Sequence, residues 1–135
     1  MSLITERLVL RAARQDDLMD LFAIFNDARA MRYWSTPLHE SPERTQQNLD
    51  RLIASAARQL TYFVIEKDNR AIGTAGMHKE DEVGFLLQPD YWRQGIVTEA
   101  MSAIIPHLFE ITDHPQLTAD ADPRNDASVG ILKSL

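Results

Sequence analysis

The chain contains no cysteine among its 135 residues. Disulfide bonds, thiolate nucleophiles and zinc sites built on cysteine are therefore excluded. No apolar run approaches the roughly 18 residues of a membrane span, and the N-terminus lacks the apolar segment of a signal peptide. Basic residues are in deficit, with 14 Lys and Arg against 20 Asp and Glu, whereas a nucleic-acid surface needs a basic excess. We expect a cytoplasmic protein whose partners include neither a membrane nor a nucleic acid.

The composition is that of an ordinary globular domain. Apolar residues make up 44% of the chain and charged residues 25%, which is not the balance of a disordered segment. A chain of 135 residues can bury one sizeable core. Internal repeats and low-complexity stretches are absent from the sequence, so residues 1–135 are expected to form a single domain.

Hydrophobic spacing predicts a strand, two helices and a loop in the first half of the chain. Arg7 to Ala12 reads as a strand, and the apolar residues from about Asp16 to Asn26 have helical spacing. Arg32 to Glu40 is a loop rich in aromatic residues and proline. Ser41 followed by Pro42 is typical of a helix start, because serine caps free N–H groups and proline fits the first helical position. The second helix then presents one apolar face of Leu49, Leu52, Ile53 and Ala56.

Three strands joined by hairpins follow. Leu60 to Glu66 is rich in strand-forming residues, and Asp68-Asn69 can adopt the positive φ angles of a tight turn. Ala71 to His78 forms the returning strand. Glu80-Asp81 is expected at the next hairpin tip, and Glu82 to Gln88 in the strand after it.

The last third of the chain predicts a crossover back to the sheet. A long helix begins at Gly95 and contains Pro106, which should kink it or end it early. Leu117 to Ala121 is expected to be a short strand, and a final helix is expected from Asn125 or Asp126 through Leu132. Hairpins followed by a β-α-β crossover predict a mixed α+β fold, with a mainly antiparallel sheet and helices on both faces.

The most informative segment is Asp90 to Ala100, where a strand turns through a glycine into a helix. Such a turn leaves several backbone N–H groups unpaired at the positive end of a helix dipole, which favours a phosphate or pyrophosphate. The alternative is an ordinary strand-to-helix turn. The segment has one glycine and matches neither GxGxxG nor GxxxxGK[ST], so the common nucleotide-binding folds are not indicated.

Five short segments match the sequence pattern of one family. They occur in the family's order and span nearly the whole chain. They are Thr5 to Arg11, Ile72 to Gly76, Glu82 to Phe85, Pro89 to Ala100 and Asp122 to Ser128. With them the chain resembles the general-control-related N-acetyltransferases (GNAT), and among these the branch that acetylates ribosomal-protein N-termini. The resemblance implies the GNAT fold and acetyl transfer from acetyl-CoA to a primary amine, with no metal.

Two positions depart from the family pattern. The family turn usually has glycine or alanine where this chain has Val97, whose branched side chain would crowd a pyrophosphate unless it points away. The family also continues past Leu135 with two more strands, so the resemblance implies a GNAT fold without its C-terminal strand pair. The strand at Leu117 to Ala121 would then have a bare outer edge, an association hazard. We expect that another chain covers this edge, that the stretch is irregular, or that residues follow Leu135; a homodimer is left open.

The resemblance assigns most of the cofactor contacts to backbone groups. The pantetheine arm is implied to lie beside the strand at Phe85, Leu86 and Leu87, with Asn125 as a further contact. Asn125 is also a suitable helix cap, and the two roles are compatible. The pyrophosphate is implied to bind the backbone N–H groups of Arg93, Gln94, Gly95, Ile96, Val97 and Thr98.

Glu82 and Ser128 are the catalytic candidates. Acetyl transfer needs a base for the ammonium group, and alternation along the strand puts Glu82 on one face with Gly84 and Leu86. The alternative for Glu82 is an exposed hairpin charge. The resemblance implies that Ser128 protonates or hydrogen-bonds the leaving thiolate, through water more readily than directly. The alternative for Ser128 is a bond to the backbone of its own helix.

The acceptor side of the site is the least specified. Tyr33, Trp34 and His39 lie in the loop where the family shapes its acceptor site, although loop aromatics also cover cores. His78 and His107 lack the spacing of metal ligands. The net charge of −6 favours a basic or neutral amine acceptor, either a protein α-amine or a small molecule. Two functions remain: an acetyl-CoA-dependent N-acetyltransferase, or a catalytically impaired module that binds CoA.

Overall fold

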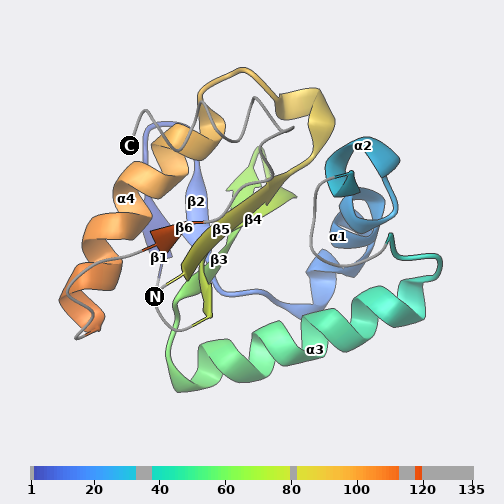
Figure 1. Ribbon diagram of the computed structural model, residues 1–135, viewed down its shortest axis with the longest axis horizontal. Coiled ribbons are helices and arrows are strands. Elements are labelled where there is room, and N and C mark those ends of the chain that lie inside the picture. Colours follow the sequence, from blue (N-terminus) through green and yellow to red (C-terminus); the bar gives the residue numbers. More distant parts are fainter. Residues whose placement is uncertain (1, 33–37, 80–81, 113–117, 120–135) are drawn as a thin grey trace.

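The computed structural model describes residues 2–32, 38–79, 82–112 and 118–119. Helices surround a central sheet (Figure 1). The N-terminal elements are β1 (Ser2–Ile4), β2 (Val9–Arg11), the 3-10 turn η1 (Gln15–Asp17), α1 (Leu18–Phe25), α2 (Ala28–Met31) and α3 (Pro42–Arg58). The following elements are β3 (Tyr62–Lys67), β4 (Arg70–Lys79), β5 (Glu82–Leu87), the 3-10 turn η2 (Pro89–Tyr91), α4 (Ile96–Ile111) and β6 (Thr118–Ala119).

The strands of the described residues form one sheet in chain order, from β1 to β6. Strands β1 to β5 pair antiparallel, and β6 pairs parallel with β5. The predicted hairpin between β3 and β4 is confirmed, because Asp68 and Asn69 have φ angles of 52° and 64°. The predicted fold class, a mixed and mainly antiparallel sheet, is confirmed as well.

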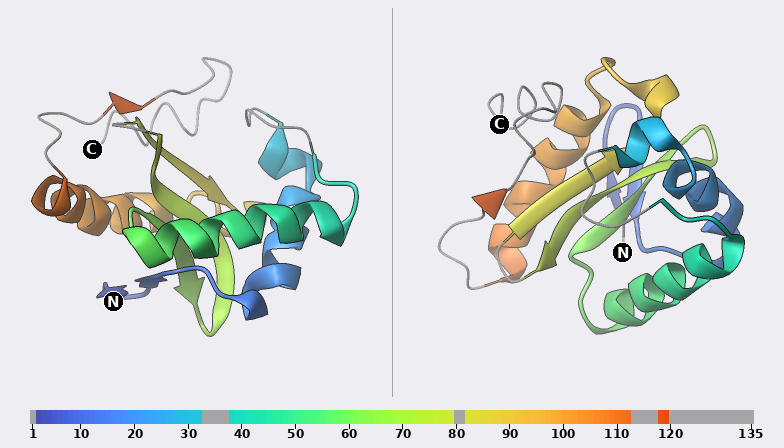
Figure 2. Two further views of the ribbon diagram at one scale, coloured as in Figure 1. Left: turned by 90° about the horizontal axis from the view of Figure 1, so that it is seen from below. Right: turned by 45° about the vertical axis from the view of Figure 1, so that its right-hand side comes forward.

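Helices cover both faces of the sheet (Figure 2), with α4 on one face and α1, α2 and α3 on the other. The residues buried with α4 include Leu10, Phe63, Ile65, Val83, Leu87, Met101, Ile104 and Leu108. The residues buried on the opposite face include Leu21, Ile24, Phe25, Leu49, Val64 and Leu86. This division confirms the predicted alternation along β5, since Val83 and Leu87 face α4 whereas Leu86 faces the other helices.

The structure departs from the sequence prediction in three elements. Of the two effects expected of Pro106, a kink or an early end of the helix, the early end is not found, since α4 continues past Pro106 to Ile111. Proline removes one hydrogen bond there, but buried neighbours on both sides of it, Ile104 and Leu108, pack the helix onto the sheet and outweigh that loss. The strand β1 and the four-residue helix α2 were not predicted. Glu80-Asp81 and the final helix lie outside the described residues, and of Leu117 to Ala121 only β6 is described.

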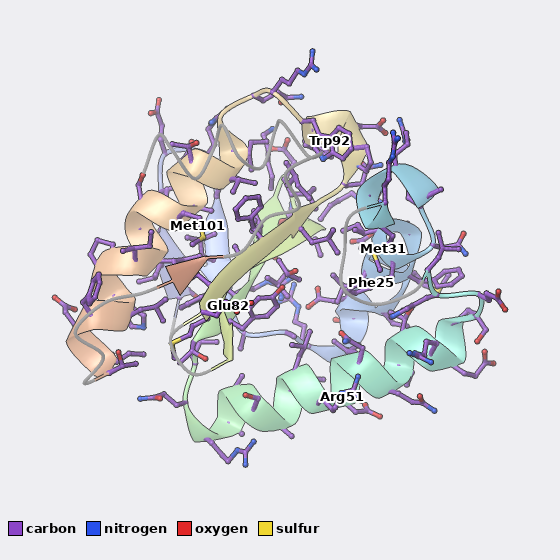
Figure 3. All side chains as sticks on the ribbon, in the orientation of Figure 1. Phe25, Met31, Arg51, Glu82, Trp92 and Met101 are labelled. Atoms are coloured by element: carbon purple, nitrogen blue, oxygen red, sulfur yellow. The ribbon has the colours of Figure 1, made fainter. Side chains whose placement is uncertain are left out.

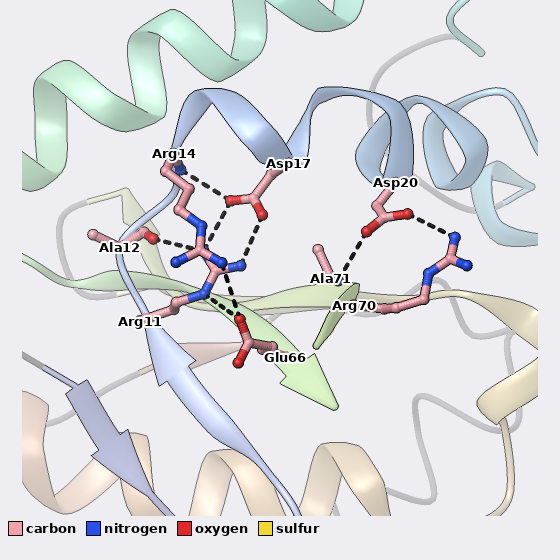
Figure 4. A network of polar contacts seen from close by, with 8 residues as sticks. All are labelled: Arg11, Ala12, Arg14, Asp17, Asp20, Glu66, Arg70 and Ala71. Atoms are coloured by element: carbon pink, nitrogen blue, oxygen red, sulfur yellow. Dashed lines mark hydrogen bonds and ion pairs between the residues drawn. The ribbon is translucent and has the colours of Figure 1, made fainter. Parts of the chain in front are cut away.

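A buried ion-pair network joins β2 to the first helical turn and to β3 (Figure 4). Arg11 donates from two guanidinium nitrogens to Asp17, at 2.9 and 2.8 Å, and from Nε to Glu66 at 2.8 Å. The Asp17 carboxylate also accepts the backbone N–H of Arg14 at 2.9 Å. Hydrogen bonding to Asp17 raises the pKa of Arg11, burial opposes this, and Glu66 reinforces it. The network therefore fixes where α1 starts relative to the sheet.

None of the described helices is both long and apolar enough to cross a membrane.

Candidate functional site

The turn between β5 and α4 is held in shape by its own side chains. The Gln88 side chain accepts the backbone N–H of Asp90 at 2.7 Å, and the backbone N–H of Trp92 closes η2 on Pro89 at 3.1 Å. The Trp92 indole N–H donates to the carbonyl of Leu87, the last residue of β5, at 3.1 Å. These bonds fix the path of the chain as it leaves the sheet.

Two residues with positive φ then direct the chain into α4. Arg93 has φ of 63°, and Gly95, the N-cap of α4, has φ of 74°. A Cβ at Gly95 would meet only Arg7 Nη2, at 3.6 Å, so glycine is required there by the backbone angle and not by lack of space. The predicted strand-glycine-helix turn is confirmed in this geometry.

The backbone N–H groups from Arg93 to Thr98 have no hydrogen-bond partner among the described residues. Within the part of the chain that the structure describes, no side chain caps the start of α4. The next paired donor is Glu99, whose N–H bonds the Gly95 carbonyl at 3.0 Å. A run of unpaired donors at the positive end of a 16-residue helix can hold an anion.

The Val97 side chain does not obstruct this turn. Val97 is 3% exposed and packs in the apolar cluster beneath α4, as does Ile96. Both side chains therefore point into the core and away from the space above the free donors. The departure from the family pattern at Val97 therefore does not crowd the space above these unpaired donors.

A clamp from the N-terminal segment, which the sequence did not reveal, fixes the start of α4. The Arg7 guanidinium donates to the Gln94 carbonyl at 2.9 Å and to Glu99 Oε1 at 2.7 Å. Glu99 Oε2 accepts the Arg7 backbone N–H at 2.9 Å and the Thr5 hydroxyl. Partial burial would raise the pKa of Glu99, but the hydrogen bonds from Thr5 and Arg7 outweigh burial and lower it. The signal lay in the segment Thr5 to Arg11, which resembled the family without suggesting a contact to α4.

The outer edge of β5 offers a second set of backbone groups. The Gln88 N–H bonds the Ile72 carbonyl of β4 at 2.8 Å. Because backbone groups alternate along an antiparallel strand, the N–H and C=O of Leu86 also point toward β4, whereas those of Phe85 and Leu87 point away from it. The described part of β6 pairs with β5 only at Glu82 and Val83. The groups of Phe85 thus lie on an edge that β6 does not cover within the described residues, whereas the Leu87 carbonyl bonds Trp92.

Glu82 is the first residue of β5, and Figure 3 shows it at the opposite end of that strand from Trp92. It is partly buried and lies in register with Thr118 of β6 on one side and Lys79 of β4 on the other. By alternation its side chain shares the face of Leu86, which α1 and α3 cover. The structure thus brings Glu82 to the end of β5 where β6 joins it.

The same face carries a partly buried polar pair, Tyr62 and Thr74, that the sequence alone did not indicate. The Tyr62 hydroxyl lies 2.9 Å from Thr74 Oγ1, and burial raises the pKa of Tyr62 to about 12. Tyr62 is in register with Gly76, which is in register with Gly84 of β5. Gly76 has φ of 142°, and a Cβ there would lie 2.3 Å from the Thr61 carbonyl, so no other residue fits.

His39 anchors the end of the loop that precedes α3. It is 3% exposed, its ring stacks on Phe25 with centroids 4.5 Å apart, and Nδ1 lies 2.8 Å from Thr45 Oγ1. Its backbone N–H donates to the Phe25 carbonyl at 2.9 Å. These contacts give His39 a structural role. Of the other predicted site residues, Tyr33, Trp34, Asn125 and Ser128 lie outside the described residues.

Comparisons with known proteins agree on one family. The family model for the acetyltransferase (GNAT) domain matches residues 7–135. The uncharacterized N-acetyltransferase YoaA of Bacillus subtilis (strain 168) is 27% identical over 95% of this chain and 77% of its own. The spermidine N(1)-acetyltransferase of Escherichia coli (strain K12) is 24% identical over 93% and 70%. The crystal structure of an acetyltransferase from Salmonella typhimurium that modifies the N-terminal serine of ribosomal protein L7/L12 has a TM-score of 0.81 at 20% identity, covering 96% of this chain and 80% of its own.

Proposed function

Because the chain belongs to the GNAT acetyltransferase family and is an acyltransferase, we propose that it transfers an acetyl group from acetyl-CoA to a primary amine. The observation that carries this proposal is the run of unpaired N–H groups from Arg93 to Thr98, with Val97 turned into the core beneath them. A pyrophosphate carries the negative charge that such a site favours. Arg7 holds the turn in place without occupying its donors.

The pantetheine arm of the proposed cosubstrate fits the outer edge of β5. Its amides can pair with the backbone of Phe85 and with the N–H of Leu87, while the Leu87 carbonyl already accepts the Trp92 indole N–H. The backbone N–H and C=O of Leu86 point toward β4. The pantetheine contact predicted for Leu86 therefore passes to the backbone groups of Phe85 and Leu87. The contact predicted for Asn125 remains a prediction from the family resemblance.

The reaction asks little of the protein beyond positioning and proton removal. Acetyl-CoA supplies an activated thioester, and the amine attacks its carbonyl directly once the amine is neutral. We assign proton removal to Glu82, directly or through one water, and keep for Ser128 the predicted role toward the leaving thiolate.

Two acceptor classes are consistent with the relatives. One similar protein is named for spermidine, and one structure of the same fold for an N-terminal serine of a ribosomal protein. Both acceptors are primary amines, which is the chemistry proposed here. The alternative, a module that binds CoA without turnover, was suggested in part by Val97, and that ground is removed because Val97 points inward.

Substitution of Gly95 tests the cofactor site. Gly95→Ala keeps the N–H but strains a residue with φ of 74°, whereas Gly95→Pro removes the donor and cannot adopt this angle. We expect acetyl-CoA affinity, measured by calorimetry, to fall a few-fold in Gly95→Ala and at least about tenfold in Gly95→Pro. Circular dichroism melting curves verify that both variants fold. Unchanged affinity in Gly95→Pro would exclude this turn as the pyrophosphate site.

Glu82→Gln tests the base. A well-placed general base contributes about 10²–10⁴-fold, so we expect a turnover loss in that range with nearly unchanged acetyl-CoA affinity. The pH dependence of turnover should shift as well. Turnover is measured as free CoA released with a panel of amines. A loss of less than about threefold means that Glu82 is not the base, and no release with any amine supports the CoA-binding module instead.

A further inference from the structure

Three arginines on α3 differ from five other arginines of the described residues, and they share with Arg93 the lack of an ion-pair partner there. Arg7, Arg11, Arg14, Arg29 and Arg70 all form ion pairs at 3.4 Å or less. Arg44, Arg51 and Arg58, which we call the α3 arginine row, are exposed and have no ion-pair partner among the described residues.

The sequence of α3 places the row on one flank of the helix. Seven residues separate Arg44 from Arg51 and Arg51 from Arg58, which brings each side chain back to nearly the same direction about 10.5 Å further along the axis. The opposite flank holds Gln46, which bonds Gln15 at 2.9 Å and Asp50 at 2.8 Å. The row therefore lies on the flank of α3 that faces away from η1.

Stability of the helix does not explain the row. None of the three arginines has an acidic residue three or four positions away within α3, so no intrahelical pair supports them. Arg44 lies in the first turn, where the helix dipole disfavours a positive charge. Only Arg58, in the last turn, is placed favourably. Positive charge is thus kept on this flank at some cost to the helix.

The row borders the part of the molecule assigned to the acceptor. Leu49 of α3 and Leu86 of β5 belong to the same buried cluster, on the sheet face that Glu82 shares. Burial lowers the pKa of His39, and the charges of Arg44 and Arg51 lower it further, so both guanidinium groups lie within electrostatic reach of the loop before α3. Figure 3 labels Arg51 on the helix that runs along this side of the sheet.

Charge and spacing narrow the class of ligand. Three uncompensated cations would repel a polyamine. The net charge of −6 disfavours a nucleic acid, whose phosphates form a continuous charged line. A polypeptide in the polyproline II conformation has three residues per turn, so carboxylates at every third residue share one face and repeat every ~9 Å, close to the spacing of the row. The net charge alone favoured a basic or neutral acceptor. The α3 arginines form a local positive surface on this negatively charged protein, and that surface favours an acidic ligand instead.

We propose that the α3 arginine row docks an acidic segment of the polypeptide whose amine is acetylated. The proposal rests on the proposed function and specifies its acceptor as an acidic protein or peptide. Each guanidinium pairs with one carboxylate, so the row selects the acceptor and takes no part in the transfer itself.

The test compares two peptides with the same first four residues and a free N-terminus. One carries Glu at every third following position and the other carries Gln there. The variants are Arg44→Gln/Arg51→Gln/Arg58→Gln and a charge-matched control, Met19→Glu/Asn69→Asp/Ser102→Glu. Each triple change makes the protein more negative by the same amount. The control positions are exposed and lie on α1, on the β3–β4 turn and on α4, away from α3. The triple Arg→Lys variant keeps the charge of the row.

Wild-type protein should acetylate the acidic peptide with a kcat/KM about tenfold above that of the neutral one, the sum of three exposed ion pairs. The preference should vanish in the Arg→Gln variant, persist in the control and the Lys variant, and weaken with salt. Turnover with the neutral peptide should stay unchanged in all variants.

Equal rates with both peptides in wild type would overturn the docking proposal and leave the acetyltransferase intact. A preference for spermidine over both peptides, tight binding of a single-stranded oligonucleotide lost in the Arg→Gln variant, or a wild-type dimer that this variant dissociates would also overturn it. No CoA release with any amine would refute the proposed function and the acceptor role together.

Discussion

Arg7 and Arg11 lie four residues apart in one segment, but they bind different parts of the molecule and differ in burial. Arg11 is 10% exposed at its side chain and bonds two carboxylates within the fold, Asp17 and Glu66. Arg7 is 38% exposed and bonds a carboxylate and a carbonyl at the start of α4. The buried arginine ties elements together, whereas the exposed one shapes a turn that has free donors. Similar bond lengths therefore do not mean similar contributions to stability.

Arg11→Met should have the largest effect on folding. The substitution leaves the carboxylates of Asp17 and Glu66 without their main partner in a buried setting, and breaking a buried pair from one side costs about 3–5 kcal/mol. Urea unfolding followed by circular dichroism measures the loss. Arg11→Lys keeps the charge but not the forked geometry, so its unfolding free energy should lie between those of wild type and Arg11→Met. A loss below about 1 kcal/mol in Arg11→Met would place this network with ordinary surface pairs.

Arg7→Gln should separate the two arginines. The exposed Arg7–Glu99 pair is worth at most about 1 kcal/mol of unfolding free energy. Loss of the bond to Gln94 should loosen the turn and weaken acetyl-CoA binding by about two- to fivefold, the value of one helix-terminus contact. Calorimetric titration of the variant measures this. The comparison fails if Arg7→Gln destabilises the fold as much as Arg11→Met does.

The smallest expected effect is on pH dependence. The hydrogen bonds from Thr5 and Arg7, against the opposing effect of burial, hold the pKa of Glu99 below its ordinary value of 4.5. Because the folded-state pKa is the lower one, the stabilisation is complete above the ordinary value and is lost as the pH falls through the lowered value. Unfolding curves of wild type and Arg7→Gln, recorded from about pH 6 to about pH 3, should therefore converge at the acid end. A constant difference over that range would argue against Glu99 as its source.

Local chemistry predicted much of the fold. Asp68-Asn69 specified a hairpin, Ser41-Pro42 a helix start and Gly95 a strand-to-helix turn, because each acts within a few residues of itself. The continuation of α4 past Pro106 depends on packing against the sheet, so the local effect of proline did not decide where this helix ends. The three-residue strand β1 depends on its pairing with all three residues of β2.

The sequence predicted the part of the candidate site that consists of backbone groups in one turn. It did not predict the part that depends on contacts between segments far apart in the chain. The donors from Arg93 to Thr98 followed from the turn itself. The clamp by Thr5 and Arg7 and the alternating edge of β5 required the register of the sheet. Nothing in the sequence between Arg7 and Glu99 indicated that the two would meet.

The clamp on α4 joins residues far apart in the chain, since 92 positions separate Arg7 from Glu99. Closing so long a loop carries a large entropy cost, whereas the β3–β4 hairpin closes through two residues. During synthesis the N-terminal segment must wait until Glu99 has left the ribosome before its partner exists. We expect the hairpins to form first and the turn between β5 and α4 last, so that a chain with this turn in place has already folded from β1 to the start of α4.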